Sequence, residues 1–279
     1  MTTPTHEKAL RLQSLHQSAS AFVIPNAWDP GSARLLAGMG FEALATSSGA
    51  AAMVLGRRDG QITREEAIAH GRAIAAAVDV PVSADLENGF GDAPDAAALT
   101  IRLAGEAGLV GGSIEDASGN TGKPIYDLAH AVERVAAAVQ AARALPFAFQ
   151  LTARAEGFLH GADDLDQIIE RLQAYERAGA DVLFAPGLPS LAAVRAVCGA
   201  LRKPVNFMVA IPGKSFSVAE LQAAGVRRIS LATSLYRAAM SGLLDAAREV
   251  KERGTFSYLD QAAPTGTLLK LMAGRSATD

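Results

Sequence analysis

Short apolar runs alternate along the chain with longer alanine-rich segments whose apolar residues recur at helical spacing. Short runs rich in Val, Ile, Leu and Phe are typical of buried parallel strands. We expect strands at residues 22–25, 43–47, 82–85, 112–115, 148–153, 182–185, 205–208 and 229–232. Amphipathic helices are expected between them, at residues 30–39, 64–78, 93–107, 128–144, 165–178, 191–201, 218–223 and 235–253.

Eight strands alternating with eight helices predict an α/β fold, a (β/α)8 TIM-type barrel that occupies residues 1–279 as a single domain. An extra helix at residues 5–18 precedes the barrel. Asp29 followed by Pro30 is typical of a helix N-cap and first turn. The alternative is an open doubly wound sheet, but the sequence has no Gly-x-Gly-x-x-Gly turn after the first strand.

Residues 254–279 form a C-terminal helical extension in this interpretation. The pattern predicts a helix at residues 267–272 after Pro264 and Gly266. Its apolar face is expected to pack against another surface, and a partner subunit is one candidate, so we expect a homo-oligomer. The face consists of Leu268, Leu269, Leu271 and Met272.

Composition narrows the classes of function. Hydrophobic residues make up 49% of the chain and charged residues 20%, which is typical of a globular protein with a large core. The net charge of −3 gives no basic surface for nucleic acid. The single cysteine, Cys198, cannot form an internal disulfide, which suits a reducing cytoplasm. No apolar stretch has membrane-spanning length and residues 1–20 lack a signal-peptide core, so we expect a cytoplasmic enzyme without membrane contact.

Two acids lie close together where the apolar run 82–85 meets a glycine-containing turn. Asp85 and Glu87 are two residues apart, and in extended backbone such residues point to the same side. Two close carboxylates repel each other, and a bound Mg²⁺ relieves that repulsion. For an isolated pair, two solvated loop acids are the simpler interpretation, so the prediction depends on the other strand ends.

Polar residues follow other expected strands as well, and in a barrel the C-terminal strand ends form the active site. Singly they have simple explanations: Arg154 could pair with Glu156 or Asp181, and Trp28 could serve packing. Together they predict a metal site for an anionic substrate. Oxygen ligands favour Mg²⁺ or Mn²⁺ over zinc, and no histidine pair has metal-ligand spacing. The further strand-end residues are Asn26, Ser47, Ser48, Gly49, Glu115, Asp116 and Asn206.

Six segments, in this order and spacing, resemble the isocitrate lyase / phosphoenolpyruvate mutase superfamily over nearly the whole chain. They are residues 25–34 (PNAWDPGSAR), 46–50 (TSSGA), 56–59 (GRRD), 83–91 (SADLENGFG), 113–116 (SIED) and 152–154 (TAR). The resemblance implies a (β/α)8 barrel whose last helix is swapped between subunits, commonly in a dimer of dimers (homotetramer). It also implies Mg²⁺ (or Mn²⁺) and a 2-oxo acid or enolate as ligand.

The resemblance assigns roles residue by residue. It implies that Asp85 binds the metal directly, while the metal's waters are held by Asp59, Glu87 and Glu115. It implies that Ser48, Gly49 and Ala50 bind the substrate carboxylate and that Arg154 stabilises the leaving group or oxyanion. Further expected substrate contacts are Trp28, Ser47 and Asn206.

The chain also departs from the resembled branches. The loop 117–124 (ASGNTGKP) lacks the Cys that lyases use for proton transfer, although Asn120 and Thr121 resemble part of the mutase loop. Residues 184–187 (FAPG) carry neither the Glu of lyases nor the His of mutases. Glu87 stands where many relatives have Asp. Glu115 is therefore the candidate for proton transfer, with Asn120 as a catalytic loop residue.

These observations support a Mg²⁺-dependent lyase that cleaves a C–C bond in a small 2-oxo or 2-hydroxy di- or tricarboxylate, as methylisocitrate and dimethylmalate lyases do, through a metal-stabilised enolate. An oxaloacetate decarboxylase or C–C hydrolase is the second hypothesis, because decarboxylation requires no protein acid at carbon. Phosphonomutase or phosphonopyruvate hydrolase chemistry is the third. A non-catalytic barrel that binds 2-oxo acids remains a fourth.

Overall fold

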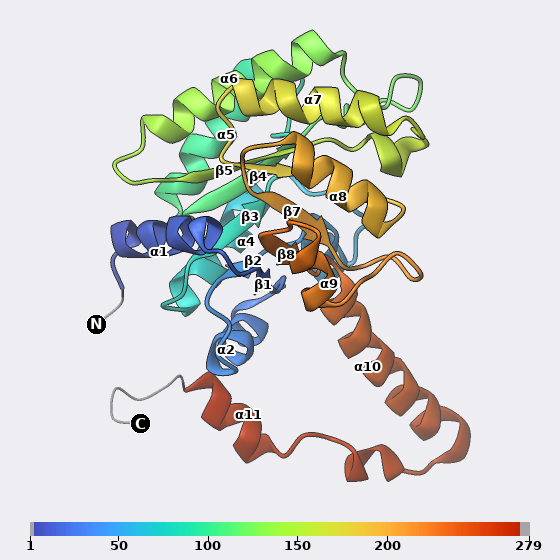
Figure 1. The fold of residues 1–279 in the computed structure, drawn as a ribbon. Coiled ribbons are helices and arrows are strands. Elements are labelled where there is room, and N and C mark those ends of the chain that lie inside the picture. Colours follow the sequence, from blue (N-terminus) through green and yellow to red (C-terminus); the bar gives the residue numbers. More distant parts are fainter. Residues whose placement is uncertain (1–2, 274–279) are drawn as a thin grey trace.

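The computed structural model describes residues 3–273, which form a barrel of eight parallel strands surrounded by helices (Figure 1). The hydrogen-bonded order is β1-β8-β7-β6-β5-β4-β3-β2. An isolated parallel bridge between Asn26, just after β1, and Ala45 of β2 connects the two ends of that order. The barrel prediction is confirmed. The strands are β1 (Phe22–Ile24), β2 (Leu44–Ala45), β3 (Val82–Asp85), β4 (Gly111–Glu115), β5 (Gln150–Arg154), β6 (Val182–Phe184), β7 (Val205–Met208) and β8 (Arg228–Ser230).

The helices fall where the amphipathic segments predict them. Their ends carry the expected signals: Asp29 caps the second helix by accepting a hydrogen bond from the Ser32 amide at 2.6 Å, with Pro30 as the first helical residue. The helices are α1 (Thr5–Gln17), α2 (Pro30–Gly38), α3 (Ser48–Val54), α4 (Arg64–Ala77), α5 (Pro94–Glu106), α6 (Leu128–Arg143), α7 (Leu165–Arg177), α8 (Leu191–Ala200), α9 (Val218–Ala223), α10 (Ser234–Arg253) and α11 (Thr265–Met272). Short 3-10 turns lie at η1 (Gly157–His160) and η2 (Ser257–Asp260).

Helix α3 is the main element that the sequence pattern did not predict. The run 43–47 was expected to be a strand ending in a Ser-Gly turn, but β2 stops at Ala45 and a helix begins at Ser48. Ser47 adopts extended backbone and its hydroxyl accepts from the Ala50 amide at 3.3 Å, so it is an N-cap. The alanines that follow favour helix. The Ser-Gly segment is thus a helix N-terminus rather than a turn.

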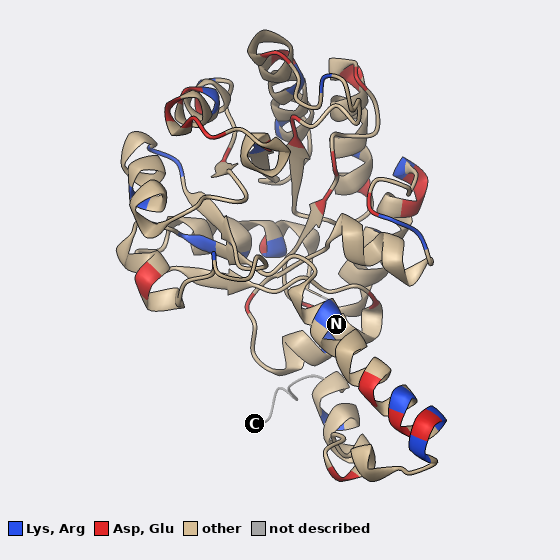
Figure 2. Cartoon of the chain, turned by 90° about the vertical axis from the view of Figure 1, so that its right-hand side faces the viewer, with Lys and Arg blue, Asp and Glu red and all other residues tan. Residues whose placement is uncertain are grey.

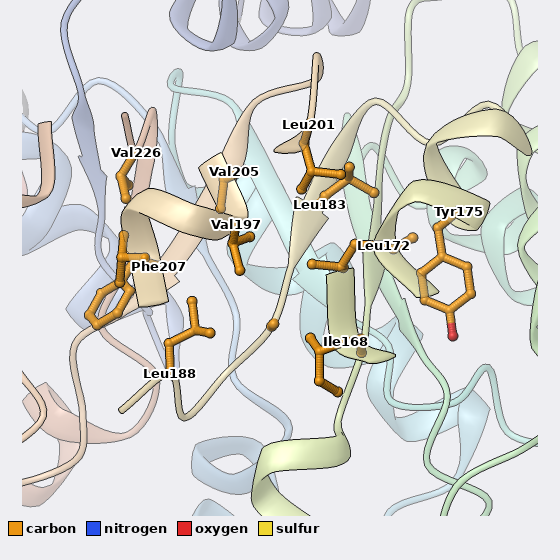
Figure 3. Close-up of a cluster of buried hydrophobic side chains, with 14 of the residues drawn as sticks. Ile168, Leu172, Tyr175, Leu183, Leu188, Val197, Leu201, Val205, Phe207 and Val226 are labelled. Atoms are coloured by element: carbon orange, nitrogen blue, oxygen red, sulfur yellow. The ribbon is translucent and has the colours of Figure 1, made fainter. Parts of the chain in front are cut away.

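The apolar core lies between the strands and the helices, not inside the barrel. One cluster joins α7 and α8 to the outer faces of β6 and β7, with Leu172, Leu183, Val197 and Val205 packed together (Figure 3). Each such buried side chain contributes about 2 kcal/mol. The inward-facing positions are instead mostly polar, including Thr152, Asn206 and Arg228. The interiors of such barrels are usually filled by branched apolar residues. The polar interior of this barrel differs from that rule.

Helix α10 reaches away from the barrel, and residues 254–273 of the predicted C-terminal extension return to it (Figure 1), while residues 274–279 lie outside the described residues. Helix α10 projects outward, with charged residues of both signs along its outer part, residues 245–253 (Figure 2). Leu243 and Leu244 on this helix are 59% and 60% exposed. Helix α11 packs on α2, where Gly38 leaves room for the backbone of Leu271. Within residues 3–273, no helix combines the length and the hydropathy needed to cross a membrane.

The expected apolar face of the last helix is half-buried against α2 at Leu268, Leu271 and Met272, whereas Leu269 is 62% exposed. The helix begins at Thr265, two residues earlier than predicted. The exchange of helices between subunits stays a prediction, because the structure holds one chain.

Candidate active site

Asp85 ends β3 at the C-terminal mouth of the barrel and is held on several sides. Its Oδ2 accepts hydrogen bonds from the Ser48 amide at 3.2 Å and from the Ser48 hydroxyl at 3.0 Å. Its own amide donates to Thr46 Oγ1 at 2.9 Å, and Ser113 Oγ on the neighbouring strand lies 3.5 Å from Oδ1. The carboxylate is therefore held by the start of α3 and by β4, while the Thr46 hydroxyl holds the Asp85 backbone amide.

Glu87 lies near Asp85, but not through strand alternation as the sequence suggested. The strand ends at Asp85, and Glu87 adopts a left-handed backbone with φ of 50°. Such a conformation costs a non-glycine residue roughly 1 kcal/mol or more and often marks a functional site. The Glu87 amide faces Asp85 Oδ1 at 3.4 Å, and its carbonyl accepts from the Glu115 amide at 3.0 Å. Burial first, then Asp85 and Asp59, raise the pKa of Glu87 to about 7.

Arg154, at the end of β5, is a single cation surrounded by three acids. Its Nη1 lies 3.3 Å from Glu115 Oε2 and 3.5 Å from Asp85 Oδ1, and its Nε pairs with Glu156. The Phe184 ring lies beneath the guanidinium, 5.2 Å from ring centroid to Cζ. Burial opposes the charge of Arg154, but the surrounding carboxylates outweigh it and raise the pKa of Arg154. The pairing with Asp181, left open by the sequence, is wrong, because Asp181 pairs with Arg143 at 2.6 Å.

The acids of this cluster resist full ionisation. Burial raises the pKa of Glu115 well above its usual range, and Arg154 opposes that rise without cancelling it. Burial likewise raises the pKa of Glu156, and burial followed by Asp85 raises that of Asp59. Carboxylates that repel each other at close range favour a bound cation or a shared proton.

The Asp59 carboxylate lies against Gly49 in the first turn of α3. A Cβ at Gly49 would lie 3.1 Å from Asp59 Oδ2, so the missing side chain of Gly49 is what lets the carboxylate lie against the helix. Ser48 and Ala50 are buried in the first turn of the same helix. Backbone N–H groups at a helix N-terminus favour anions. The C-terminal mouth of the barrel thus carries two regions of opposite electrostatic character: the N–H groups at the start of α3 favour anions, and the acids favour a cation.

The donor set fits Mg²⁺ or Mn²⁺, since every candidate ligand atom is a carboxylate oxygen. Glu87 Oε1 is buried and has no hydrogen-bond partner within residues 3–273, so it is free to accept from a metal-bound water. Across the same residues, no three Asp, Glu, His or Cys side chains stand close enough to enclose a bare ion. Mg²⁺ in proteins usually keeps several waters and is bound directly by only one or two carboxylates.

A small cavity of about 40 Å³ lies below Asp85 and Arg154 within the barrel. Asn206 lines it, donating to Ser230 Oγ at 3.0 Å while its own Oδ1 is buried without a partner among the described residues. The sequence pattern did not single out several of the other lining residues. Inward-facing alternation along each strand is the signal that could have found them: Ser113, Thr152, Arg228 and Ser230.

Two predicted site residues lie apart from this cluster. Asn120 is exposed on the loop after β4, and its side-chain oxygen accepts from the Gly122 amide at 2.8 Å. Trp28 is half-buried and stacks edge-on against Tyr236, with ring centroids 5.5 Å apart. Asp116, next to Glu115, is a structural acid: it accepts from the Tyr175 hydroxyl at 2.7 Å and lies 3.3 Å from Arg171.

Cysteine and histidine take no part in the cluster. Burial raises the pKa of the Cys198 thiol to about 11, which fits the expected unreactive residue on α8. His160, near a strand end, is exposed on η1. His70 Nε2 lies 2.9 Å from the Trp28 carbonyl oxygen.

Comparisons with known proteins agree with this geometry. Residues 12–251 match the family described as phosphoenolpyruvate phosphomutase. The chain is 30% identical to the 2-methylisocitrate lyase of Aeropyrum pernix over 261 residues, which cover 90% of this chain and 82% of that protein.

Two solved structures are similar over almost the full length. A protein of assumed lyase or mutase activity from Burkholderia cenocepacia J2315 superposes with a TM-score of 0.94 and 50% identity, covering 98% of each chain. A 2,3-dimethylmalate lyase superposes with a TM-score of 0.85 and 28% identity, covering 98% of this chain and 95% of that one. The family match spans most of the residues, so this chain belongs to the phosphoenolpyruvate phosphomutase family, within the PEP mutase/isocitrate lyase superfamily.

Proposed function

We propose that this protein is a Mg²⁺-dependent lyase that cleaves a C–C bond in a small 2-oxo or 2-hydroxy di- or tricarboxylate. The observation that carries the proposal is the convergence of Asp85, Glu87, Glu115 and Arg154 beside the N-terminus of α3. Similarity to lyases that act on such acids supports the same class of reaction.

In this proposal Asp85 contacts the metal directly, and Asp59, Glu87 and Glu115 hold its waters. When bound, Mg²⁺ supplies a Lewis acid to the oxygens of a 2-oxo or 2-hydroxy acid. The first turn of α3, at Ser48, Gly49 and Ala50, binds the substrate carboxylate with Ser47 as its cap. Trp28 and Asn206 complete the substrate contacts.

Arg154 serves the chemistry through its charge. It is shared among three carboxylates, so a substrate oxyanion competes with these acids for the guanidinium. Negative charge that develops as the C–C bond breaks is stabilised by a fixed, buried cation that needs no rearrangement. This role predicts a loss of rate, rather than of metal affinity, when Arg154 is replaced.

Glu115 is the proposed proton carrier. Burial raises its pKa, which suits a group that delivers a proton to the carbon released by cleavage. The exposed loop 117–124 has glycines at Gly119 and Gly122 that let it close over the mouth and bring Asn120 to the substrate. The loop also lacks an ionisable acid of its own.

A specific observation favours decarboxylation of an oxaloacetate-like acid as the second candidate. Loop 117–124 provides neither Cys nor His for proton transfer at the leaving carbon. Decarboxylation releases CO₂ and needs only stabilisation of the remaining charge, with solvent as proton source. The same acids and Arg154 would suffice for that reaction.

The deciding experiment follows products by proton and phosphorus NMR. Purified protein is incubated with 2-oxo acids, isocitrate-type hydroxy acids and phosphonopyruvate, with Mg²⁺ or with chelator. We expect a Mg²⁺-dependent C–C cleavage product. Loss of CO₂ with formation of a 2-oxo acid one carbon shorter would select the decarboxylase. A phosphorus-containing product would select phosphonate chemistry, and line broadening without product would indicate a binding protein.

The metal assignment has a matched pair of variants. Asp85→Asn should abolish Mg²⁺ binding by calorimetry and any turnover, while circular dichroism stays that of the parent. Asp163→Asn changes the same charge on an exposed loop and should change neither. Retained Mg²⁺ affinity in Asp85→Asn would reject the ligand assignment.

We also propose that the chain works in the cytoplasm as a homo-oligomer. The single half-buried cysteine suits a reducing compartment. The outward reach of α10 and the exposed leucines on it suit contact with a second copy, with residues 254–273 as part of the same arm of a single-domain chain.

A further inference from the structure

The loop between β3 and α5, residues 88–93, has every one of its carbonyl oxygens bonded to an arginine side chain. Arg134, on α6, donates to four of these oxygens, with Nη1 2.6 Å from the oxygen of Gly91. Arg64, on α4, donates to the other two, with Nη2 3.0 Å from the oxygen of Phe90. The carbonyls bonded to Arg134 are those of Asn88, Gly91, Asp92 and Ala93. Side chains from two helices thus hold a loop that belongs to no strand.

The guanidinium of Arg134 is buried where it forms no ion pair. The residue is 1% exposed, and within residues 3–273 no carboxylate oxygen lies within 4.0 Å of its nitrogens. Burial of a charge opposes folding unless hydrogen bonds compensate it. Here the compensation comes from the loop carbonyls and from the Tyr126 ring, whose centroid lies 4.6 Å from Cζ. The burial of Arg134 and the shape of the loop therefore depend on each other.

The backbone follows an unfavourable path through this part of the chain. Glu87 and Phe90 have φ of 50° and 59°, in the left-handed region that non-glycine residues rarely adopt. Such backbone persists only where surrounding contacts impose it, and the arginine bonds to residues 88–93 are contacts of that kind. The Glu87 carbonyl accepts from the Glu115 amide of β4 at 3.0 Å, so this hydrogen bond reports where Glu87 lies.

We propose that Arg134 is a positioning residue for the candidate metal site: by bonding the carbonyls of residues 88–93, it holds Glu87 beside Asp85. The inference rests on the proposed function, in which Glu87 holds a water of the metal. Arg64 supports the same loop from α4, where its Nε also donates to Thr100 Oγ1 at 2.8 Å. Arg134 has the larger share, since it bonds four of the six carbonyls. Residues that orient metal ligands in this way typically change metal affinity about 10- to 100-fold when replaced.

Hydrogen exchange in metal-free protein tests the positioning role without the metal. In Arg134→Met the Glu115 amide should exchange about tenfold faster than in the parent, because the Glu87 carbonyl no longer stays against it. The Asp116 amide, which donates to the Arg154 carbonyl at 3.2 Å, is the internal control and should keep its rate. An unchanged rate at the Glu115 amide would overturn the proposal.

Arg134→Lys keeps a buried cation with fewer and less spread donors, so the rate at the Glu115 amide should fall between those of the parent and Arg134→Met. Circular dichroism checks that each variant is folded. If Arg134→Met does not fold, Arg134→Lys decides by the same comparison, and a rate equal to that of the parent would again reject the role of Arg134.

Calorimetry with Mg²⁺ tests the consequence for the site. Arg134→Met should weaken Mg²⁺ binding about tenfold or more, and Arg134→Lys should recover part of that loss. Arg143→Met removes a half-exposed arginine from the same helix, whose hydrogen bonds go to other segments, and should bind Mg²⁺ like the parent. Parent-like affinity in Arg134→Met would contradict the proposal.

A double-mutant cycle shows whether Arg134 acts through Glu87. In the Glu87→Gln background, Arg134→Met should change the Mg²⁺ affinity less than about twofold, because the residue that it positions is already replaced. Fully additive losses would mean that Arg134 acts on another part of the site, against the proposal. A parent protein that binds no Mg²⁺ would reject the proposed metal site, whereas the exchange of the Glu115 amide decides by itself whether Arg134 holds Glu87 in place.

Discussion

The hydroxyl of Ser48 donates to Oδ2 of Asp85 at 3.0 Å, and the Ser48 amide reaches the same oxygen at 3.2 Å. This contact joins the start of α3 to the end of β3 through two residues that are 37 positions apart in sequence. It couples the place proposed for the substrate carboxylate to the residue proposed as metal ligand. A substrate carboxylate at this helix N-terminus must therefore share the Ser48 donors with Asp85 or displace it toward the metal.

Arg154 should be important for stability as well as for rate. Arg154→Met leaves Asp85, Glu115 and Glu156 facing one another without their cation, and breaking a buried ion pair typically costs about 3–5 kcal/mol. The loss should be larger at pH 8 than at pH 5, because protonation relieves the repulsion among these acids. Urea denaturation of metal-free protein at both values measures it.

The matched control is Arg143→Met, which breaks the half-exposed pair with Asp181 and should cost about 1 kcal/mol or less. Equal losses in the two variants would mean that the cluster around Arg154 is not a buried network that the cation holds together.

Glu87 should make Mg²⁺ affinity depend on pH. Its pKa is raised to about 7, so protons compete with the metal below that value. We expect the Kd for Mg²⁺ to rise by up to about tenfold per pH unit below 7 and to level off above it. Calorimetry between about pH 5.5 and 8 checks this. Glu87→Gln should flatten the profile, while Glu106→Gln, an exposed acid on α5, should not; an unaltered profile in Glu87→Gln would remove Glu87 from the site.

The same residue predicts an opposite trend in metal-free protein. A carboxyl whose pKa is higher folded than unfolded favours the folded state when protonated. Stability should therefore fall as pH rises from about 4.5 to about 7, and Glu87→Gln should lessen that fall.

His16 should contribute to acid sensitivity. Burial, and then the charge of Arg228, lower its pKa from 6.5 to about 3, so the unfolded chain binds a proton there that the folded chain refuses. The stabilising contribution is complete above about pH 6.5 and is lost as pH falls toward 3, with a slope approaching about 1.4 kcal/mol per pH unit. Urea denaturation from about pH 7 to 4.5 should show a shallower slope in His16→Gln. His6→Gln, exposed on α1, should keep the parent slope, and identical slopes in all three proteins would assign the acid sensitivity to other groups.

The exposed leucines of α10 should lie in an interface between subunits. Leu243→Glu with Leu244→Glu would place two charges in an apolar contact, so the mass by light scattering should fall toward that of one chain. Leu10→Glu on α1, where the leucine is 44% exposed, is the control and should keep the parent mass. A double variant that assembles like the parent would reject α10 as the interface.

The alternation of apolar runs and amphipathic segments was sufficient to predict the barrel, because strands buried on their outer faces and helices with one apolar stripe each have a characteristic period. The β7 range was predicted without error, and Asp29-Pro30 marked the start of α2. The sequence also pointed to Asp85, Glu115 and Arg154, since chemistry in a barrel gathers at the C-terminal ends of strands.

The tertiary structure alone decided how those residues meet. Glu87 lies past the end of its strand in left-handed backbone, which alternation could not predict, because a tight turn rather than local propensity imposes it. The sharing of Arg154 among three acids, and the polar interior with Arg228, arise from contacts between strands distant in sequence. A cavity beside His16 also depends on the tertiary structure, because α1 and the starts of three strands line it. Local sequence patterns do not specify the distances between elements that come together only on folding.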